Sequence, residues 1–191
     1  MLIENKTFDE LTIGATAELK RLCTQDDLIV FANVSGNHNP LHLYDRDGDG
    51  DGRNEAVAPG LYLGAIISAV LGNILPGAGT LYRAQSLRFH ARAHAGEELL
   101  ARVTVTAKVA ETRGVTLATE LRRASDDTLL LSGEAEVEAP KVKIHRNAAD
   151  VPGLILQRHR HFEALLERAA PLPALRTAVV CPEEVNSLGG A

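Results

Sequence analysis

The stretch VAPGLYLGAIISAVLGNILPG, residues 57–77, decides the fold. Every position in it is apolar or small and uncharged except for one Ser and one Asn. Pro59 precedes the run and Pro76–Gly77 ends it, which predicts a helix from about Gly60 to Leu75. A helix that is apolar on all faces is expected to be buried on all faces. The rest of the chain therefore has to wrap around it.

Four segments after this helix have the composition and alternation of β-strands. They span residues 80–93, 98–112, 114–125 and 127–140. The breaks between them contain Gly96, Gly114 and Asp126–Asp127, which are typical of hairpin connections. The sequence therefore predicts a meander and an α+β fold, in which a curved antiparallel sheet wraps around a central buried helix.

A shorter helix is predicted before the apolar one, in TQDDLIVFANVSG, residues 24–36. Thr24 is a good N-cap and Gly36 can end the helix. The stretch SGNHNPLH, residues 35–42, follows at once. It is too polar for a core and too rich in His, Asn and Pro for an ordinary loop, so it is the first candidate for a site.

The composition of the 191 residues limits the classes of partner. The net charge of −5 disfavours nucleic acid and anionic membranes. No apolar run approaches the roughly 20 residues that span a bilayer, and the N-terminus has no signal-peptide core. The two cysteines, Cys23 and Cys181, are far apart, and neither lies in a CxxC motif. They are expected to be unpaired thiols, which predicts a cytoplasmic protein.

Three segments in order, FANVSGNHNPLHL, VAPGLYLGAIISAVLG and LPGAGTLYRAQSLRFHARAHAGEEL, resemble the MaoC-like, (R)-specific enoyl-CoA hydratase family. The resemblance covers about residues 8–140. It implies a hot-dog fold, a homodimer formed by pairing of sheets, and an acyl-CoA thioester as substrate with no cofactor. The expected domain is residues 1–140.

The resemblance also assigns site residues. His42 falls on the family's catalytic His, Asn37 on its Asp, and Ser68 on a helix Ser that helps to place them. Gly60 falls on the glycine whose backbone N–H faces the thioester oxygen. An amide cannot accept a proton as a carboxylate can, so Asn37 predicts weakened or altered activity.

Two further departures point the same way, since Pro59 replaces a His and Tyr44 replaces an Asp of the family pattern. The alternative is a non-catalytic domain that binds acyl-CoA or mediates dimerisation.

Arginines on the first predicted strand are candidates for binding the phosphates of coenzyme A. Arg88 is the main one, with Arg83 and Arg92 nearby. Solvated charges on a strand face are the ordinary alternative.

The loop DRDGDGDGRNEA, residues 45–56, matches the first ligand positions of an EF-hand at Asp45, Asp47 and Asp49. Its twelfth position is Ala56 instead of Glu, and no pair of helices flanks it. We therefore expect a solvated, flexible acidic loop and no metal.

The last 51 residues, 141–191, differ in character from the rest. They read as a basic linker, an amphipathic helix over 154–170 and a short strand at Thr177–Val180. The segment LPALRTAVVCPEEVNSLGGA is similar to the opening strand of a phosphate acetyl- or butyryltransferase domain, which suggests a fusion.

Overall fold

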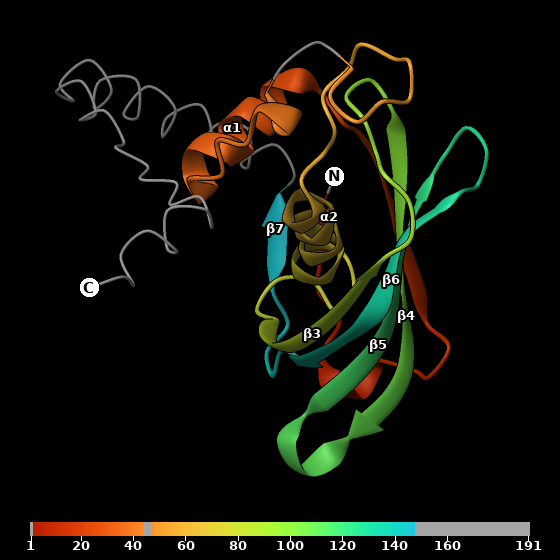
Figure 1. Ribbon diagram of the computed structural model, residues 1–191. Coiled ribbons are helices and arrows are strands. Elements are labelled where there is room, and N and C mark those ends of the chain that lie inside the picture. Colours follow the sequence, from red (N-terminus) through yellow and green to blue (C-terminus); the bar gives the residue numbers. More distant parts are fainter. Residues whose placement is uncertain (1, 44–46, 148–191) are drawn as a thin grey trace, which may run out of the picture. The chain divides into compact units, whose positions relative to one another are not determined.

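The apolar helix forms as predicted and is the centre of the fold. It is α2, Gly60–Asn73, with Pro59 as its N-cap. A five-stranded antiparallel sheet curves around it, so that α2 lies on the concave face (Figure 1). This computed structural model describes residues 2–43 and 47–147, and Leu2–Arg146 form one compact unit.

Several predicted features lie outside the described residues. They are Tyr44, Asp45, the helix over 154–170 and the strand Thr177–Val180. The boundary at residue 140 stays a prediction, although the compact unit continues to Arg146. There a two-stranded sheet joins β1, Leu2–Glu4, to β7, His145–Asn147.

All four predicted strands are present, together with one strand from before the helices. The strands are β2 (Thr16–Leu22), β3 (Leu81–Phe89), β4 (Glu98–Val109), β5 (Gly114–Arg123) and β6 (Leu129–Glu138). Their order across the sheet is β2-β4-β5-β6-β3. Short 3₁₀ turns occur at Phe8–Glu10, Pro40–His42 and Ala110–Thr112.

The simple meander is wrong, because β3 pairs with β6 and not with β4. The segment between β3 and β4 is not a hairpin but pairs with the chain that leads into α2. Ala58 N–H donates to Ala93 O at 2.7 Å, and Ala95 N–H donates to Ala56 O at 2.9 Å. β3 is thereby carried to the far edge. There a Cβ at Gly133 would lie 1.8 Å from Ser86 O, so only glycine allows this pairing.

The core lies between α2 and the sheet. From α2, six side chains are buried, namely Tyr62, Leu63, Ile66, Ile67, Val70 and Leu71. The inward positions of β4 and β5 alternate with exposed or half-buried ones, as the sequence pattern predicts. This burial holds the start of α2 in a defined place relative to the strands.

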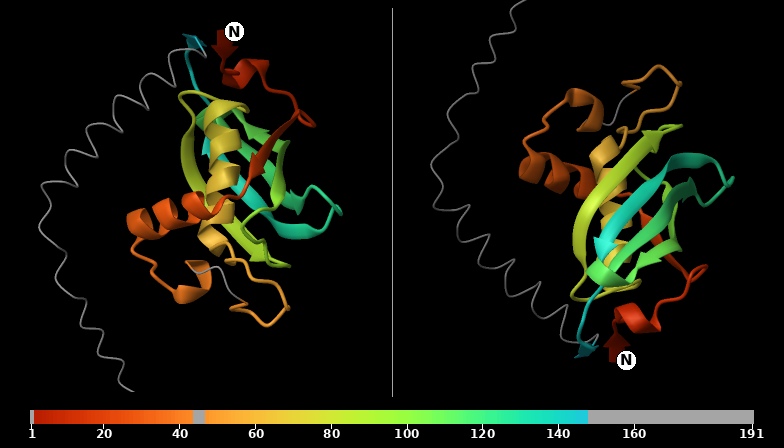
Figure 2. Two further views of the ribbon diagram at one scale, coloured as in Figure 1. Left: turned by 90° about the horizontal axis from the view of Figure 1, so that it is seen from above. Right: turned by 90° about the horizontal axis from the view of Figure 1, so that it is seen from below.

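The prediction that α2 is buried on every face is wrong for the single chain. Leu61 is 68% exposed, and Ala65 and Ser68 are exposed on the same face. The view from above in Figure 2 looks onto this face of α2, with the sheet behind the helix. A sheet on one side of a helix covers only that side. The neighbouring edge strand, β3, is also open, and Leu81 is 54% exposed.

The second helix, α1, is Gln25–Ser35 and is capped as its sequence predicts. Thr24 Oγ1 accepts from Asp27 N–H at 3.1 Å, and Gly36 ends the helix with φ of 73°. Only glycine adopts this φ without strain, so the chain turns sharply here into the polar stretch. Within the described ranges, no helix is both long and apolar enough to cross a membrane.

Candidate active site

A pocket of about 350 Å³ lies where α1, the polar stretch and the start of α2 meet. Its lining consists of Phe31, Ser35, Asn37, Pro59, Gly60, Leu61 and Phe89. Two residues predicted from separate motifs, Asn37 and Gly60, therefore share one cavity. The walls are mainly apolar, and few polar groups face inward, which suits a small acyl group.

The start of α2 supplies hydrogen-bond donors at this pocket. Tyr62 and Leu63 N–H groups donate to Pro59 O, at 3.0 and 3.3 Å. In the described part of the chain, no acceptor is bonded to the N–H of Gly60 or of Leu61. Free N–H groups at a helix start favour a negatively charged oxygen, and the helix dipole adds to this.

Gly60 is also required for the shape of the pocket. A Cβ at this position would lie 2.9 Å from Cζ of Phe89. The absence of a side chain lets the Phe89 ring close the cavity against the helix start. Phe31 forms the other aromatic wall and packs edge-on to Tyr62, with ring centroids 5.8 Å apart.

His42 lies in the 3₁₀ turn Pro40–His42 and is half-buried. Its Nδ1 is 2.7 Å from Val57 O. A carbonyl oxygen only accepts, so in the neutral ring the proton sits on Nδ1 and Nε2 keeps its lone pair. This contact fixes both the tautomer and the orientation that a general base needs, although His42 is not among the residues that line the pocket.

Asn37 is exposed and belongs to a network of local turns. Its Oδ1 accepts from Asn39 N–H at 3.3 Å, and its own N–H donates to Ser35 Oγ at 3.3 Å. Asn39 Oδ1 in turn accepts from Leu41 N–H at 3.1 Å, a side-chain-to-backbone bond typical of an Asn in a turn. The side chain of Asn37 is thus oriented at the pocket wall by groups that would equally serve an Asp.

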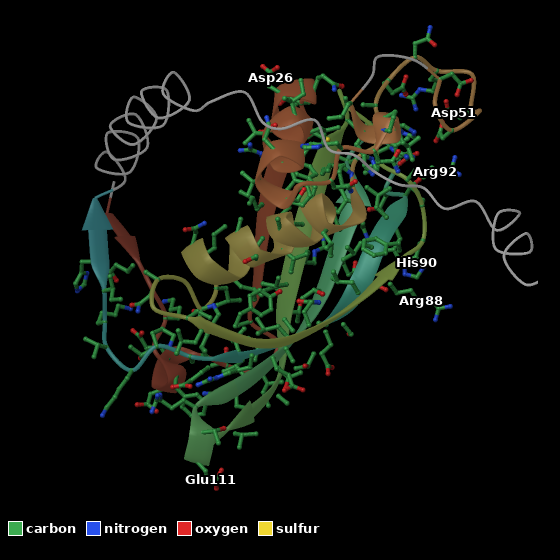
Figure 3. All side chains as sticks on the ribbon, turned by 60° about the vertical axis from the view of Figure 1, so that its left-hand side comes forward. Asp26, Asp51, Arg88, His90, Arg92 and Glu111 are labelled. Atoms are coloured by element: carbon green, nitrogen blue, oxygen red, sulfur yellow. The ribbon has the colours of Figure 1, made fainter. Side chains whose placement is uncertain are left out.

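Two predicted site residues lie elsewhere in the chain. Ser68 is seven residues after Leu61 on the exposed face of α2, roughly 10 Å further along the helix at 1.5 Å per residue. Arg88 is exposed on β3 and points away from the molecule (Figure 3). Because successive strand side chains alternate, Arg88 faces away from the pocket that Phe89 lines. The structure does not bring either residue to the cavity.

The other two arginines are engaged in ion pairs. Arg83 pairs with Glu138, and Arg92 Nη1 lies 2.8 Å from Asp49 Oδ2. These contacts account for both side chains without a bound phosphate.

The described part of the acidic loop, residues 47–56, contains local hydrogen bonds, and its predicted flexibility stays a prediction. The carboxylate of Asp47 accepts from the N–H groups of Gly50, Asp51 and Gly52, at 2.6 to 3.1 Å. Asp49 turns away from it toward His94. Because Asp47 and Asp49 are bonded in different directions, the EF-hand arrangement is not formed, and the backbone of this loop is held by its own side chains.

Three components of this site had no signal in the sequence. Phe31 and Phe89 look like ordinary core residues of a helix and a strand. The Val57 carbonyl carries no side-chain information at all. Only the packing of α1 against α2 and of β3 beside the start of α2 makes them part of the cavity.

Comparison with known proteins agrees with this geometry. The model of the MaoC like domain matches residues 10–124, which is more than half of the chain. The chain belongs to the MaoC-like family. It is 36% identical to a 3-hydroxybutyryl-CoA dehydratase of Methylorubrum extorquens, covering 70% of this chain and 84% of the relative. It is 35% identical to an (R)-specific enoyl-CoA hydratase of Rhodospirillum rubrum, covering 70% and 91%.

Solved structures of the MaoC-like family confirm the hot-dog fold. The R-hydratase PhaJ1 of Pseudomonas aeruginosa in the unliganded form aligns with a TM-score of 0.71 and 33% identity, covering 77% of this chain and 94% of that one. The (R)-hydratase of Aeromonas caviae involved in PHA biosynthesis aligns with a TM-score of 0.64 and 32% identity, covering 68% and 98%. The predicted α+β class and the central helix are therefore correct.

Proposed function

We propose that this MaoC-like chain binds an acyl-CoA thioester and acts as an (R)-specific enoyl-CoA hydratase or dehydratase with weakened activity. The observation that carries the proposal is the shared pocket of Asn37 and Gly60. Asn37, which we assign to the family's acid–base position, lines this pocket together with the start of a helix whose first N–H groups are free. Relatives named as a hydratase and a dehydratase, at 35% and 36% identity, support the same reaction.

Hydration adds the oxygen of water to carbon 3 of the enoyl thioester and a proton to carbon 2. Negative charge develops on the thioester oxygen, where the N–H groups of Gly60 and Leu61 can donate to it. His42 Nε2 has the lone pair needed to take a proton from water, and the imidazolium so formed returns that proton to carbon 2. Asn37 can hold that water through Oδ1, but it cannot take its proton. The reaction is redox-neutral and needs no cofactor.

A second candidate is a domain that binds acyl-CoA, or mediates dimerisation, without turnover. It would serve a phosphate acyltransferase fused to it, as the similarity of residues 172–191 suggests. The amide at Asn37 and the position of Ser68 outside the pocket favour this candidate.

We also propose a cytoplasmic homodimer. The open face of α2 and the neighbouring edge β3 together expose Leu61, Leu81, Tyr82 and Phe89, which are 68%, 54%, 41% and 48% accessible. Pairing of β3 with β3 of a second copy would continue the sheet and satisfy the backbone groups of this edge. It would also shield the exposed apolar side chains.

The test is hydration of crotonyl-CoA, followed by the loss of enoyl-thioester absorbance, with binding of the same ligand measured by calorimetry. His42→Ala should abolish turnover. His38→Ala is the matched control, because His38 is an exposed histidine in the same polar stretch. It should leave turnover unchanged. Binding without turnover in the unaltered protein supports the second candidate in its acyl-CoA-binding form. The absence of binding refutes both acyl-CoA functions and leaves only the dimerisation role.

A further inference from the structure

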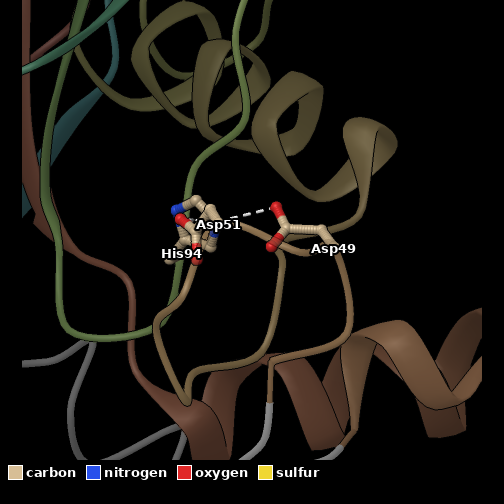
Figure 4. Close-up of side chains that lie close together, drawn as sticks. All are labelled: Asp49, Asp51 and His94. Carbon is tan, nitrogen blue, oxygen red and sulfur yellow. Dashed lines mark hydrogen bonds and ion pairs between the residues drawn. The ribbon is translucent and has the colours of Figure 1, made fainter.

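We propose that Asp49, Asp51 and His94 form a site for one divalent transition-metal cation, of the Zn²⁺ or Mn²⁺ class. The site is separate from the acyl pocket and does not depend on the proposed activity. Two of its ligands come from the acidic loop before α2, and the third comes from the segment between β3 and β4 (Figure 4).

The three side chains converge. His94 Nε2 lies 3.2 Å from Asp49 Oδ2 and 3.7 Å from Asp51 Oδ2, and the three ligand atoms lie within 4.8 Å of one another. Ligand atoms bound at about 2.1 Å in a tetrahedral site are roughly 3.4 Å apart. A small adjustment would therefore bring all three into the first coordination shell of one ion, and water could complete it.

Burial separates this cluster from a group of solvated acids. The side chains of His94 and Asp49 are 6% and 5% exposed, while that of Asp51 is 31% exposed. The inner ligands are thus enclosed, and an ion would enter on the side of Asp51.

His94 has a polar atom that the described residues leave unsatisfied, and this second observation points to a ligand. Its Nδ1 is buried without a hydrogen bond, and Glu97 Oε1 lies 3.5 Å from it. A neutral imidazole has one N–H. If the proton is on Nε2, the lone pair of Nδ1 faces the carboxylate of Glu97. If the proton is on Nδ1, the lone pair of Nε2 faces the carboxylates of Asp49 and Asp51.

A metal ion removes this conflict. With the ion on Nε2, the proton sits on Nδ1 and points at Glu97, which gives the carboxylate–histidine–metal arrangement common in proteins. The other way to remove the conflict is an imidazolium, and the experiment below distinguishes the two.

Hydrogen bonds within the loop hold the backbone at both ligands, and one of them uses a ligand side chain, since Asp51 Oδ1 accepts from Arg53 N–H at 2.9 Å. Asp47 fixes the backbone by accepting three N–H groups, and positive φ values of 78° and 85° at Gly50 and Gly52 shape the turn. The remaining competitor is Arg92, whose Nη1 is 2.8 Å from Asp49 Oδ2. Its side chain is 60% exposed and can swing into solvent.

The site also connects to the acyl pocket through the backbone. His94 forms an antiparallel bridge with Val57, whose carbonyl binds His42 Nδ1. A bound ion would therefore restrain the position of Val57, and with it the contact between the Val57 carbonyl and His42.

The chemistry of the ligands selects the metal. Imidazole with carboxylates suits Zn²⁺ and Mn²⁺, whereas Ca²⁺ prefers oxygen ligands alone. We therefore expect the untagged full chain, stripped with a chelator, to bind about one Zn²⁺ or Mn²⁺ per molecule in calorimetric titration. Binding of Ca²⁺ should be much weaker.

Asp51→Asn is the decisive variant, because Asp51 is the least buried ligand and its loss leaves the fold in place. It should weaken binding at least about 10-fold, and Glu97→Gln should weaken it about 10- to 100-fold by releasing the imidazole. Arg92→Gln should strengthen binding by removing the competitor. Asp26→Asn, an exposed carboxylate on α1, is the matched control and should have no effect.

Three outcomes would overturn the proposal. One is the absence of stoichiometric binding, which would favour the imidazolium. Another is a preference for Ca²⁺, which would exclude His94 as a ligand. The third is binding that survives Asp51→Asn but disappears when His159 and His161 are both replaced by Ala, which would assign the metal to those histidines.

Discussion

Replacing Asn37 by Asp tests whether the pocket is a hydratase site that lacks its base. The change is nearly isosteric, and the hydrogen bond from Asn39 N–H to Oδ1, at 3.3 Å, suits a carboxylate equally well. Because residue 37 is exposed, the new charge stays hydrated, and the free energy of unfolding should change by no more than about 0.5 kcal/mol.

The size of the expected gain follows from the site. A positioned acid–base group contributes about 10²- to 10⁴-fold. Two features reduce this figure. The free N–H groups of Gly60 and Leu61 would stabilise the carboxylate and make it a weaker base. Pro59 has no N–H to add to the donors for the thioester oxygen. We expect a gain of about 10-fold in kcat/KM for crotonyl-CoA, which is about 1.4 kcal/mol of the barrier.

The control is Asn39→Asp, which adds the same charge two residues away and can keep the cap on Leu41 N–H. It should give no gain. The reasoning fails if Asn37→Asp folds and binds acyl-CoA but hydrates it no faster. It also fails if the unaltered protein already turns over as fast as its active relatives, since His42 would then suffice.

Three further predictions follow from other contacts. Gly60→Ala should weaken acyl-CoA binding several-fold in calorimetry, because the new Cβ would lie 2.9 Å from the Phe89 ring. Gly72→Ala is the control, because no neighbouring atom lies within 4 Å of its Cβ. It should leave the affinity unchanged and stabilise α2 by about 0.4–1 kcal/mol. Leu81→Glu should shift the protein from dimer to monomer in sedimentation. Ile13→Glu, at a 68% exposed position before β2, should not. An unaltered protein that sediments as a monomer would refute the dimer. Hydrogen bonds from Lys143 and from Thr7 N–H lower the pKa of Glu10 to about 2 from its ordinary 4.5, so its contribution to stability is complete above pH 4.5 and is lost as the pH falls toward 2. Thermal unfolding of Glu10→Gln should therefore differ from that of the unaltered protein at pH 7 and converge with it near pH 2, and a constant difference across that range would contradict this assignment.

The sequence alone determined the elements and their class. The apolar run predicted α2, the alternation predicted β3 to β6, and Thr24 and Gly36 predicted both ends of α1. These features depend on neighbours a few residues apart, so they can be read locally. The motifs also identified Asn37 and Gly60 as residues of one site, and the pocket contains both.

Only the tertiary structure decided how these elements meet. Pairing of β3 with β6 depends on hydrogen bonds between residues 93–95 and the chain before α2. No local sequence pattern predicts these bonds. The same contact brings His94 to the acidic loop and Phe89 to the start of α2. The exposed face of α2 has a related cause. An apolar helix requires burial, but its composition does not say whether its own sheet or a second chain supplies the cover, because the hydrophobic effect has no direction.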